Sequence, residues 1–185
     1  MKTASLFLAI LVPLANAQSW QRTEKTDAFR GTQYSQFTLA GKFLTPPQHS
    51  SLDAPVIVLQ CKAGNHGYGG HWHYDGKLID AYIQTGATLN ASLSSIAVQY
   101  RLDDGKIQTE DWTPSTNYGA IFFKDITLNT LLYGHFMPHK EGTNPPVRKL
   151  TVAVDEYLAG EVVMEFDLPD PTDPASVCGT LLKRD

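Results

Sequence analysis

Three histidines, His66, His71 and His73, lie in a short glycine-rich stretch, HGYGGHWHYDG, which occupies residues 66–76. Imidazole nitrogens bind zinc; a catalytic zinc site needs three protein ligands and a structural site needs four. If the stretch is extended, His71 and His73 share a face, because side chains alternate along a strand. His66 is separated from them by GYGG, a spacer that can bring it round but predisposes no geometry.

Two interpretations of this stretch stay open. A metal site would make the protein a metal-binding protein or a metal-dependent hydrolase, with Asp75 or Asp80 as a further ligand. The spacing matches no established zinc motif such as HExxH. We therefore favour a polar loop whose histidines and Trp72 line a surface, and we expect neither a metal nor another cofactor. Metal binding through the histidine cluster is the alternative.

No other pattern in the sequence is typical of catalysis. The sequence contains no GxSxG, no phosphate-binding glycine loop and no CxxC. His135 and His139 are four positions apart, but Pro138 between them interrupts the helix that such a pair would need. The adjacent carboxylates Asp103 and Asp104 lie at a turn, where solvated acidic residues are common. The sequence thus favours a non-catalytic protein over an enzyme.

Residues 1–17 have the layout of a cleavable secretory signal. A short basic start, Met1-Lys2, is followed by the apolar run SLFLAILVPL and by small residues that end at Ala17. We expect cleavage near Ala17 and export to the periplasm or the exterior. No later apolar run reaches the roughly 20 residues that a membrane helix requires, so we expect no transmembrane segment.

Charge and cysteine content agree with this location. The formal net charge of −4 gives the protein no electrostatic reason to bind nucleic acid. Cys61 and Cys178 are an even pair in an oxidising compartment, which predicts one disulfide. Two buried free thiols are the alternative.

The apolar residues repeat with period two, which is typical of half-buried antiparallel strands. Strands are expected at 33–43, 55–61, 78–85, 95–102, 119–123, 150–157 and 162–168, with turns at 103–105, 117–119 and 159–160. Helical spacing is confined to 125–134 and 173–182. The predicted fold is all-β, a two-sheet antiparallel β-sandwich-like domain over residues 18–185 with one or two short helices.

The densest group of aromatic and charged residues falls in the hairpin at 98–123. Asp104-Gly105 is expected to supply the positive φ of its turn. Arginine and aromatic residues with a polar rim are typical of an interaction hot spot, which predicts partner binding through Tyr100, Arg101, Asp103, Lys106 and Trp112. The alternative is structural, with Arg101 and Asp103 pinning the turn and Trp112 in the core.

The same hairpin, YRLDDGKIQTEDWTPS, together with the flanking VIVLQC and VVMEFDLPD…CG segments, resembles the VasI/TagO family of exported proteins associated with bacterial type VI secretion. The matching positions are Cys61, Tyr100, Arg101, Leu102, Asp103, Gly105, Lys106, Gln108, Trp112, Ser115, Phe166, Asp167, Leu168, Cys178 and Gly179. The resemblance implies a β-rich fold, export, a Cys61–Cys178 pairing and an accessory role without catalytic residues. The segment at 63–90 is longer than the family's segment after the first Cys, and residues 131–146 have no counterpart, which fits a relative that serves another exported system.

These observations predict an exported, non-catalytic accessory or binding protein of the cell envelope, linked through the resemblance to a secretion system. Its expected partner is another protein or an envelope component. The alternative function is metal binding or metal-dependent hydrolysis through His66, His71 and His73.

Overall fold

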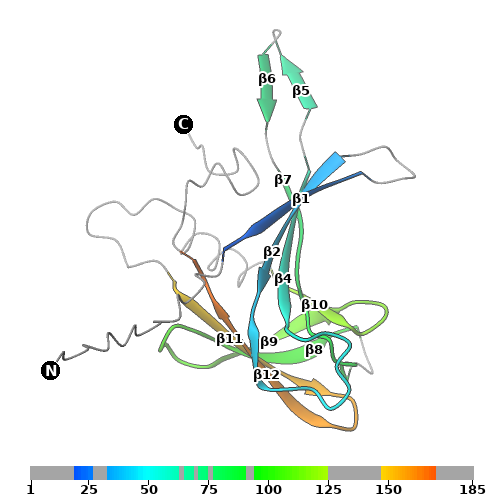
Figure 1. Cartoon of the computed structure of the whole chain (residues 1–185), viewed down its shortest axis with the longest axis vertical. Helices are drawn as coiled ribbons and strands as arrows, with labels where there is room; N and C mark the ends of the chain where they lie inside the picture. The colour runs from blue at the N-terminus through cyan, green and yellow to red at the C-terminus, as the bar shows by residue number, and fades with distance from the viewer. Residues whose placement is uncertain are drawn as a thin grey trace, which may run out of the picture.

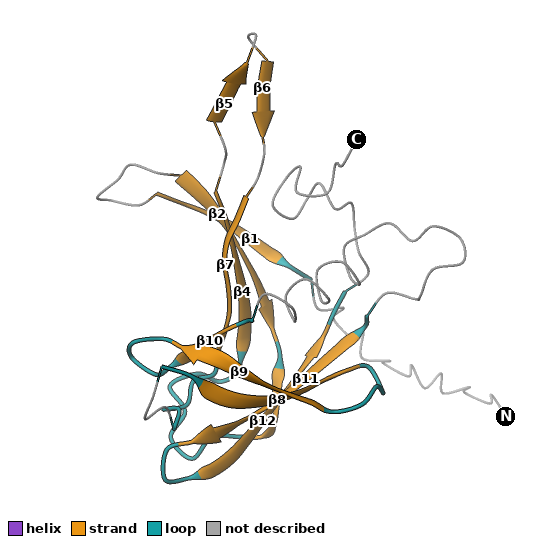
Figure 2. Cartoon of the chain, turned by 180° about the vertical axis from the view of Figure 1, so that it is seen from behind, coloured by secondary structure: helices purple, strands orange, loops and turns teal. Residues whose placement is uncertain are grey.

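The structure is a computed structural model that describes residues 19–26, 33–62, 65–68, 71–74, 77–90, 94–124 and 147–169. For 33–34, 61–62, 65–68, 71–74 and 77–80 it describes the backbone alone. All regular structure in these ranges is β, and Figure 2 shows strands and loops but no helix there. No helix in the described ranges is long and apolar enough to cross a membrane.

The described ranges contain twelve strands. In chain order they are β1 (Gln21–Thr26), β2 (Gln33–Ala40), β3 (Lys42–Thr45), β4 (Val56–Lys62), β5 (Asn65–Tyr68), β6 (His71–Tyr74), β7 (Lys77–Gln84), β8 (Ile96–Leu102), β9 (Gln108–Pro114), β10 (Ala120–Phe122), β11 (Lys149–Glu156) and β12 (Gly160–Asp167).

Ten of these strands form one antiparallel sheet, in the order β1-β2-β4-β7-β10-β9-β8-β11-β12-β3. The remaining pair, β5 and β6, makes a separate two-stranded ribbon, which extends from the upper end of the molecule (Figure 1). β2 lies near one end of the strand order and β3 is its last strand, yet only Gly41 separates them in the chain.

Only glycine fits at position 41, between β2 and β3, because the neighbouring atoms leave no room for a side chain. A Cβ at this position would lie 2.5 Å from the Phe166 ring and 2.6 Å from the Glu165 carbonyl oxygen, which is closer than atoms pack. The Gly41 amide donates to the Pro55 carbonyl at 2.8 Å. The chain therefore bends here, between the pairing of β2 with β4 and the pairing of β3 with β12.

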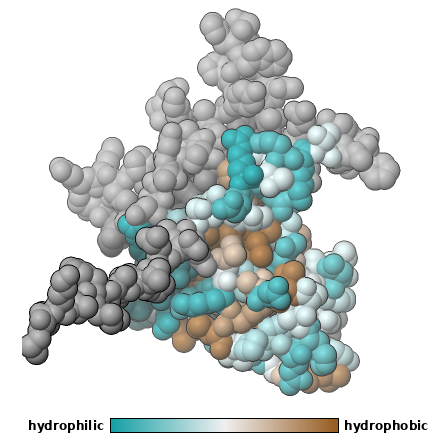
Figure 3. All heavy atoms as spheres, in the orientation of Figure 1, coloured by the Kyte–Doolittle hydropathy of each residue, from teal (hydrophilic) through white to brown (hydrophobic). Residues whose placement is uncertain are grey.

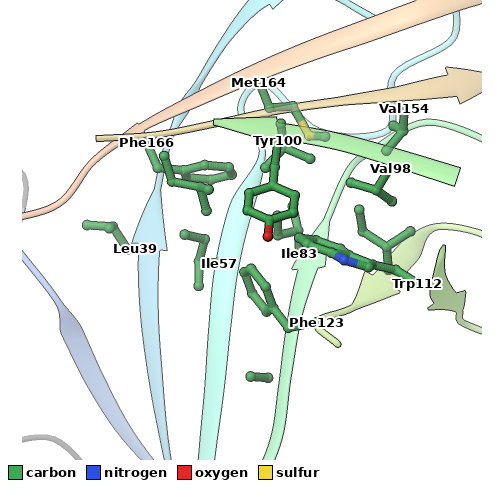
Figure 4. Close-up of a cluster of buried hydrophobic side chains, with 14 of the residues drawn as sticks. Leu39, Ile57, Ile83, Val98, Tyr100, Trp112, Phe123, Val154, Met164 and Phe166 are labelled. Atoms are coloured by element: carbon green, nitrogen blue, oxygen red, sulfur yellow. The ribbon is translucent and has the colours of Figure 1, made fainter. Parts of the chain in front are cut away.

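One hydrophobic core contains side chains from the β2–β4–β7 part of the sheet and from the β8–β11–β12 part. Leu39, Ile57 and Ile83, from β2, β4 and β7, point toward Met164 and Phe166 of β12 (Figure 4). The alternation expected for 95–102 is present, because Ile96, Val98 and Tyr100 are buried while the residues between them are exposed. Burial of one face of the strands that line this core provides the main driving force for the fold.

The structure confirms the all-β, antiparallel prediction. The structure shows one continuous ten-stranded sheet and does not show the predicted separation into two sheets, because β7, β10 and β9 pair in series and link the two parts. Alternation along a strand cannot reveal this link, since it identifies faces and not neighbours. The helices predicted at 125–134 and 173–182, the signal segment 1–17 and Cys178 lie outside the described residues.

Candidate functional site: the loop end of the sheet

Tyr100 and Trp112 are core residues. Trp112 is 1% exposed, and its ring packs 4.9 Å from the Phe123 ring and 5.9 Å from the Tyr100 ring, centroid to centroid. Glu110 accepts from both polar groups: Tyr100 Oη donates at 3.0 Å and Trp112 Nε1 at 3.1 Å. The Tyr100 hydroxyl also lies 2.8 Å from Gln108 Oε1. These aromatic residues therefore stabilise the hairpin from inside.

Asp103 fastens the β8–β9 turn to the start of β11. Its Oδ1 accepts the backbone N–H groups of Arg148 and Lys149 at 2.8 and 2.9 Å, and its own N–H donates to the Lys149 carbonyl at 2.9 Å. Asp103 also has a φ of 49°. The expectation that Asp104-Gly105 supplies the positive φ is thus wrong, because the backbone bends one residue earlier, at the residue whose side chain closes the turn.

The other predicted contact residues of the hairpin differ in exposure. Arg101 is half-buried on the outer face of β8, opposite Thr151 of β11. Arg101 Nε and Thr151 Oγ1 are buried and make no hydrogen bond, so Asp103 holds the turn and Arg101 does not. Lys106 is exposed, as is its neighbour Ile107 at 65%. Partner binding by this hairpin stays a prediction that rests on Arg101 and Lys106.

A charged cluster lies on the outer face of β12. Glu165 Oε1 lies 2.7 Å from Lys42 Nζ of β3, and Oε2 lies 3.5 Å from Lys149 Nζ of β11. The hydrogen bond from Lys42 and the charge of Lys149 lower the pKa of Glu165 against the opposing effect of burial, and the same hydrogen bond raises the pKa of Lys42. This cluster joins three strands and has a structural role.

The histidines and Cys61 can be placed by backbone register. Cys61 is in β4, opposite Ser35 of β2, and its predicted bond to Cys178 stays a prediction. His66 of β5 pairs with His73 of β6, and Tyr68 pairs with His71. Among the side chains that the structure describes, no group of three His, Cys, Asp or Glu could hold a metal ion. The side chains of His66, His71 and His73 lie outside that set.

The turns predicted at 117–119 and 159–160 lie at the opposite end of the sheet, and the sequence does not show that four loops are hydrogen-bonded together there. The segments are 46–55, 85–90, 115–119 and 155–161, which we call the loop end. The Leu89 amide donates to the Tyr118 carbonyl at 3.0 Å, and the Tyr157 amide donates to the Thr88 carbonyl at 2.8 Å. Figure 1 shows the turns of the loop end together at the lower right, away from the β8–β9 turn at the lower left.

Two buried polar residues fix these loops. Glu156 is 4% exposed, and its Oε2 accepts the Gln48 amide at 2.8 Å, which ties 46–55 to the β11–β12 turn. Thr85 Oγ1 lies 3.2 Å from the Gly119 carbonyl and the Thr85 amide donates to the same oxygen at 3.1 Å, which ties 85–90 to 115–119. Each loop thus has a partner loop that restrains it.

Three large apolar or aromatic side chains project from this restrained frame. Tyr118, Tyr157 and Leu158 are 41%, 57% and 87% exposed; we call them the loop-end surface. Tyr118 and Leu158 have φ values of 56° and 60°, a left-handed conformation that is unusual for bulky residues. Brown, hydrophobic side chains are visible at the lower tip of the molecule in Figure 3, the end where Figure 1 places the β11–β12 turn.

The rim of the loop-end surface is acidic. The four loop-end segments contain no lysine or arginine. Asp53, Asp155 and Glu161 are exposed in them, and Asp155 lies directly opposite Glu161 in the β11–β12 register. Like charges placed opposite each other on a sheet are destabilising, so this pair adds to the negative potential at the cost of some local stability.

Comparison with known proteins identifies no relative: no family model, no curated protein and no solved structure matches the chain.

Proposed function

We propose that the protein is an exported, non-catalytic binding protein that contacts another protein through the loop-end surface. The observation that carries the proposal is the exposure of Tyr118, Tyr157 and Leu158 on loops that hydrogen bonds and buried polar residues hold in place. Strained backbone at residues that the surrounding structure fixes is a feature of binding sites. A partner that covers these side chains gains their burial without having to order the loops first.

The acidic rim defines the kind of partner. Asp53, Asp155 and Glu161 are exposed in the loop-end segments, as are the apolar side chains, so the expected complementary surface is an apolar or aromatic anchor flanked by lysine and arginine. Complementary charge accelerates association and is screened by salt. We therefore expect binding to weaken as ionic strength rises, while the apolar contacts retain part of the affinity.

Several features remain part of the proposal. Residues 1–17 act as a signal that is removed near Ala17, the partner belongs to the cell envelope or an exported system, and Cys61 and Cys178 form a disulfide. The resemblance to the VasI/TagO family supports these features. A sandwich-like arrangement, in which the β2–β4–β7 part of the sheet faces the β8–β11–β12 part, is supported by the shared core of the two parts.

The test compares the mature chain, residues 18–185, with three single variants. Leu158→Ser and Tyr157→Ser alter the loop-end surface, and Ile107→Ser removes an apolar side chain that is 65% exposed from the β8–β9 turn. Each protein serves as bait for envelope and secreted fractions of the source organism, and the captured protein is then purified for calorimetry. Circular dichroism checks that each variant is folded.

We expect one basic partner that the wild type and Ile107→Ser bind equally, with affinity lowered about tenfold or more by Leu158→Ser. Equal binding by all folded variants would refute the loop-end surface. A loss of binding in Ile107→Ser alone would refute it too and would place the contact on the β8–β9 hairpin.

A further inference from the structure

The β5–β6 ribbon brings together three histidines that the sequence leaves apart. β5 covers Asn65–Tyr68 and β6 covers His71–Tyr74, paired antiparallel. In this register His66 is the direct partner of His73, and Tyr68 is the direct partner of His71. Half of the GYGG spacer, which alone determines no geometry, belongs to strand β5, where Gly67 pairs with Trp72 and Tyr68 with His71.

The register assigns the histidine positions to one face of the ribbon. Directly opposite residues of an antiparallel pair belong to the same face and have Cβ atoms about 4.5–5.5 Å apart. Positions 71 and 73 share a face because they are two residues apart, a spacing of about 7 Å along the strand. His66, His71 and His73 therefore occupy adjacent positions on one face, and Gly67 and Trp72 belong to the other.

We propose that this face of the β5–β6 ribbon binds a divalent transition-metal ion of the zinc, copper or nickel class through His66, His71 and His73. Imidazole suits these metals, and three histidines with an open fourth position form a recognised zinc-binding set. Two positions on one strand and one on its neighbour is an arrangement that a β-ribbon offers without further folding. The proposal is independent of the loop-end surface, which lies at the other end of the molecule (Figure 1).

The position of the ribbon in the fold gives a second argument. Among the strands that the structure describes, β5 and β6 pair only with each other, and an isolated two-stranded hairpin is marginally stable in water. Glycine at position 67, within β5, weakens it further. A metal ion that joins His66 to His73 would cross-link the two strands, so binding and ordering of the ribbon are coupled.

The experiment uses the mature chain without a histidine tag, dialysed against zinc, copper, nickel or cobalt chloride, with bound metal measured by elemental analysis and calorimetry. The variants are His66→Ala, His71→Ala and His73→Ala. The matched control is His49→Ala, which removes an exposed histidine from the 46–55 loop. Cobalt absorption spectra report the nitrogen ligands directly, and Leu158→Ser serves as a control for independence from partner binding.

We expect one metal ion per chain and a loss of affinity of at least about tenfold for each of the three ribbon variants, since even outer-sphere changes cost that much. His49→Ala and Leu158→Ser should bind metal as the wild type does. If His66→Ala binds normally while His71→Ala does not, the cross-strand site is refuted. Absence of stoichiometric metal with all four ions refutes the proposal as a whole and leaves the loop-end surface unaffected.

Discussion

The β8–β9 hairpin and the loop end use their residues in opposite ways. The hairpin carries the aromatic and charged residues that suggest recognition, yet Trp112 and Tyr100 are in the core and Asp103 is bound to the β11 backbone. The loop end is built from short turns with unremarkable sequences, yet it exposes Tyr157 and Leu158 to solvent. Recognition chemistry in a sequence thus does not distinguish residues that bind a partner from residues that bind the protein itself.

Backbone conformation explains part of this difference. In the β8–β9 turn the left-handed residue is Asp103, whose short polar side chain bonds to the backbone of the next strand. At the loop end the left-handed residues other than glycine are Tyr118 and Leu158, and neither makes a comparable bond from a short polar side chain. The β8–β9 turn is therefore a structural junction. The two loop-end turns that contain Tyr118 and Leu158 hold backbone strain that no side-chain bond of these residues offsets.

The largest effect is expected inside the hairpin. Trp112→Ala removes a fully buried indole and leaves Glu110 without one of its donors, which should lower the free energy of unfolding by about 3–5 kcal/mol. Urea denaturation measures the change. Ile107→Ala in the same hairpin should stay within about 0.5 kcal/mol of wild type, because it is exposed. A mild effect of Trp112→Ala would show that Trp112 is not a main stabilising residue of the hairpin and would contradict the contrast with the loop end.

The next effect concerns the fastening of the turn. Asp103→Ala removes the acceptor of two backbone N–H groups and puts a β-carbon without a compensating bond at positive φ, so the unfolding free energy should fall by about 1–3 kcal/mol. Asp103→Asn keeps one acceptor oxygen and tolerates the left-handed conformation. It should retain most of the stability in the same denaturation assay; equal losses in the two variants would remove the junction role.

At the loop end a substitution at a left-handed residue should raise the unfolding free energy instead of lowering it. Leu158→Asn replaces a side chain that is 87% exposed with one that adopts positive φ readily, which should raise the unfolding free energy by about 1 kcal/mol. Partner binding should be lost at the same time. A thermal melt and a binding assay on one preparation test both points. Lower stability would show that Leu158 contributes to folding and would make the two regions alike.

The smallest effect is the pH dependence of the unfolding free energy that comes from Glu165, in the sheet to which both regions belong. Because its folded-state pKa lies below its ordinary value of 4.5, Glu165 stabilises the fold fully above that value and loses the contribution as pH falls through the folded pKa. The loss should be about 1 kcal/mol or less. Urea midpoints between pH 7 and pH 3 should change less in Glu165→Gln than in wild type.

The sequence predicts the strands that have one buried face and misses those that do not. Alternation locates β8, β11 and β12 to within about two residues. β1, with all its residues exposed, has no apolar face and so gives no periodic signal. The sequence predicts one strand over 33–43, because it does not show that the chain changes pairing partners at Gly41.

The candidate site was largely invisible for a related reason. The turn at 117–119 was predicted from its composition, but a turn signal does not show that Tyr118, rather than Gly119, takes the positive φ. Exposure of Tyr157 and Leu158 depends on which loops lie beside them, and those contacts come from distant parts of the chain. The histidine face depends on hairpin register, which the GYGG spacer does not determine.

The Gly41 bend has a consequence for the order in which the molecule assembles. β2 can pair with β4 as soon as both are available, but β3 pairs with β12 at the far end of the sequence. In a chain that is synthesised from the N-terminus, residues 42–45 therefore lack their strand partner until β12 has been made. Such non-local closure makes folding slow. Substitution of Gly41 should then act mainly on the final closing step, leaving the earlier hairpins able to form.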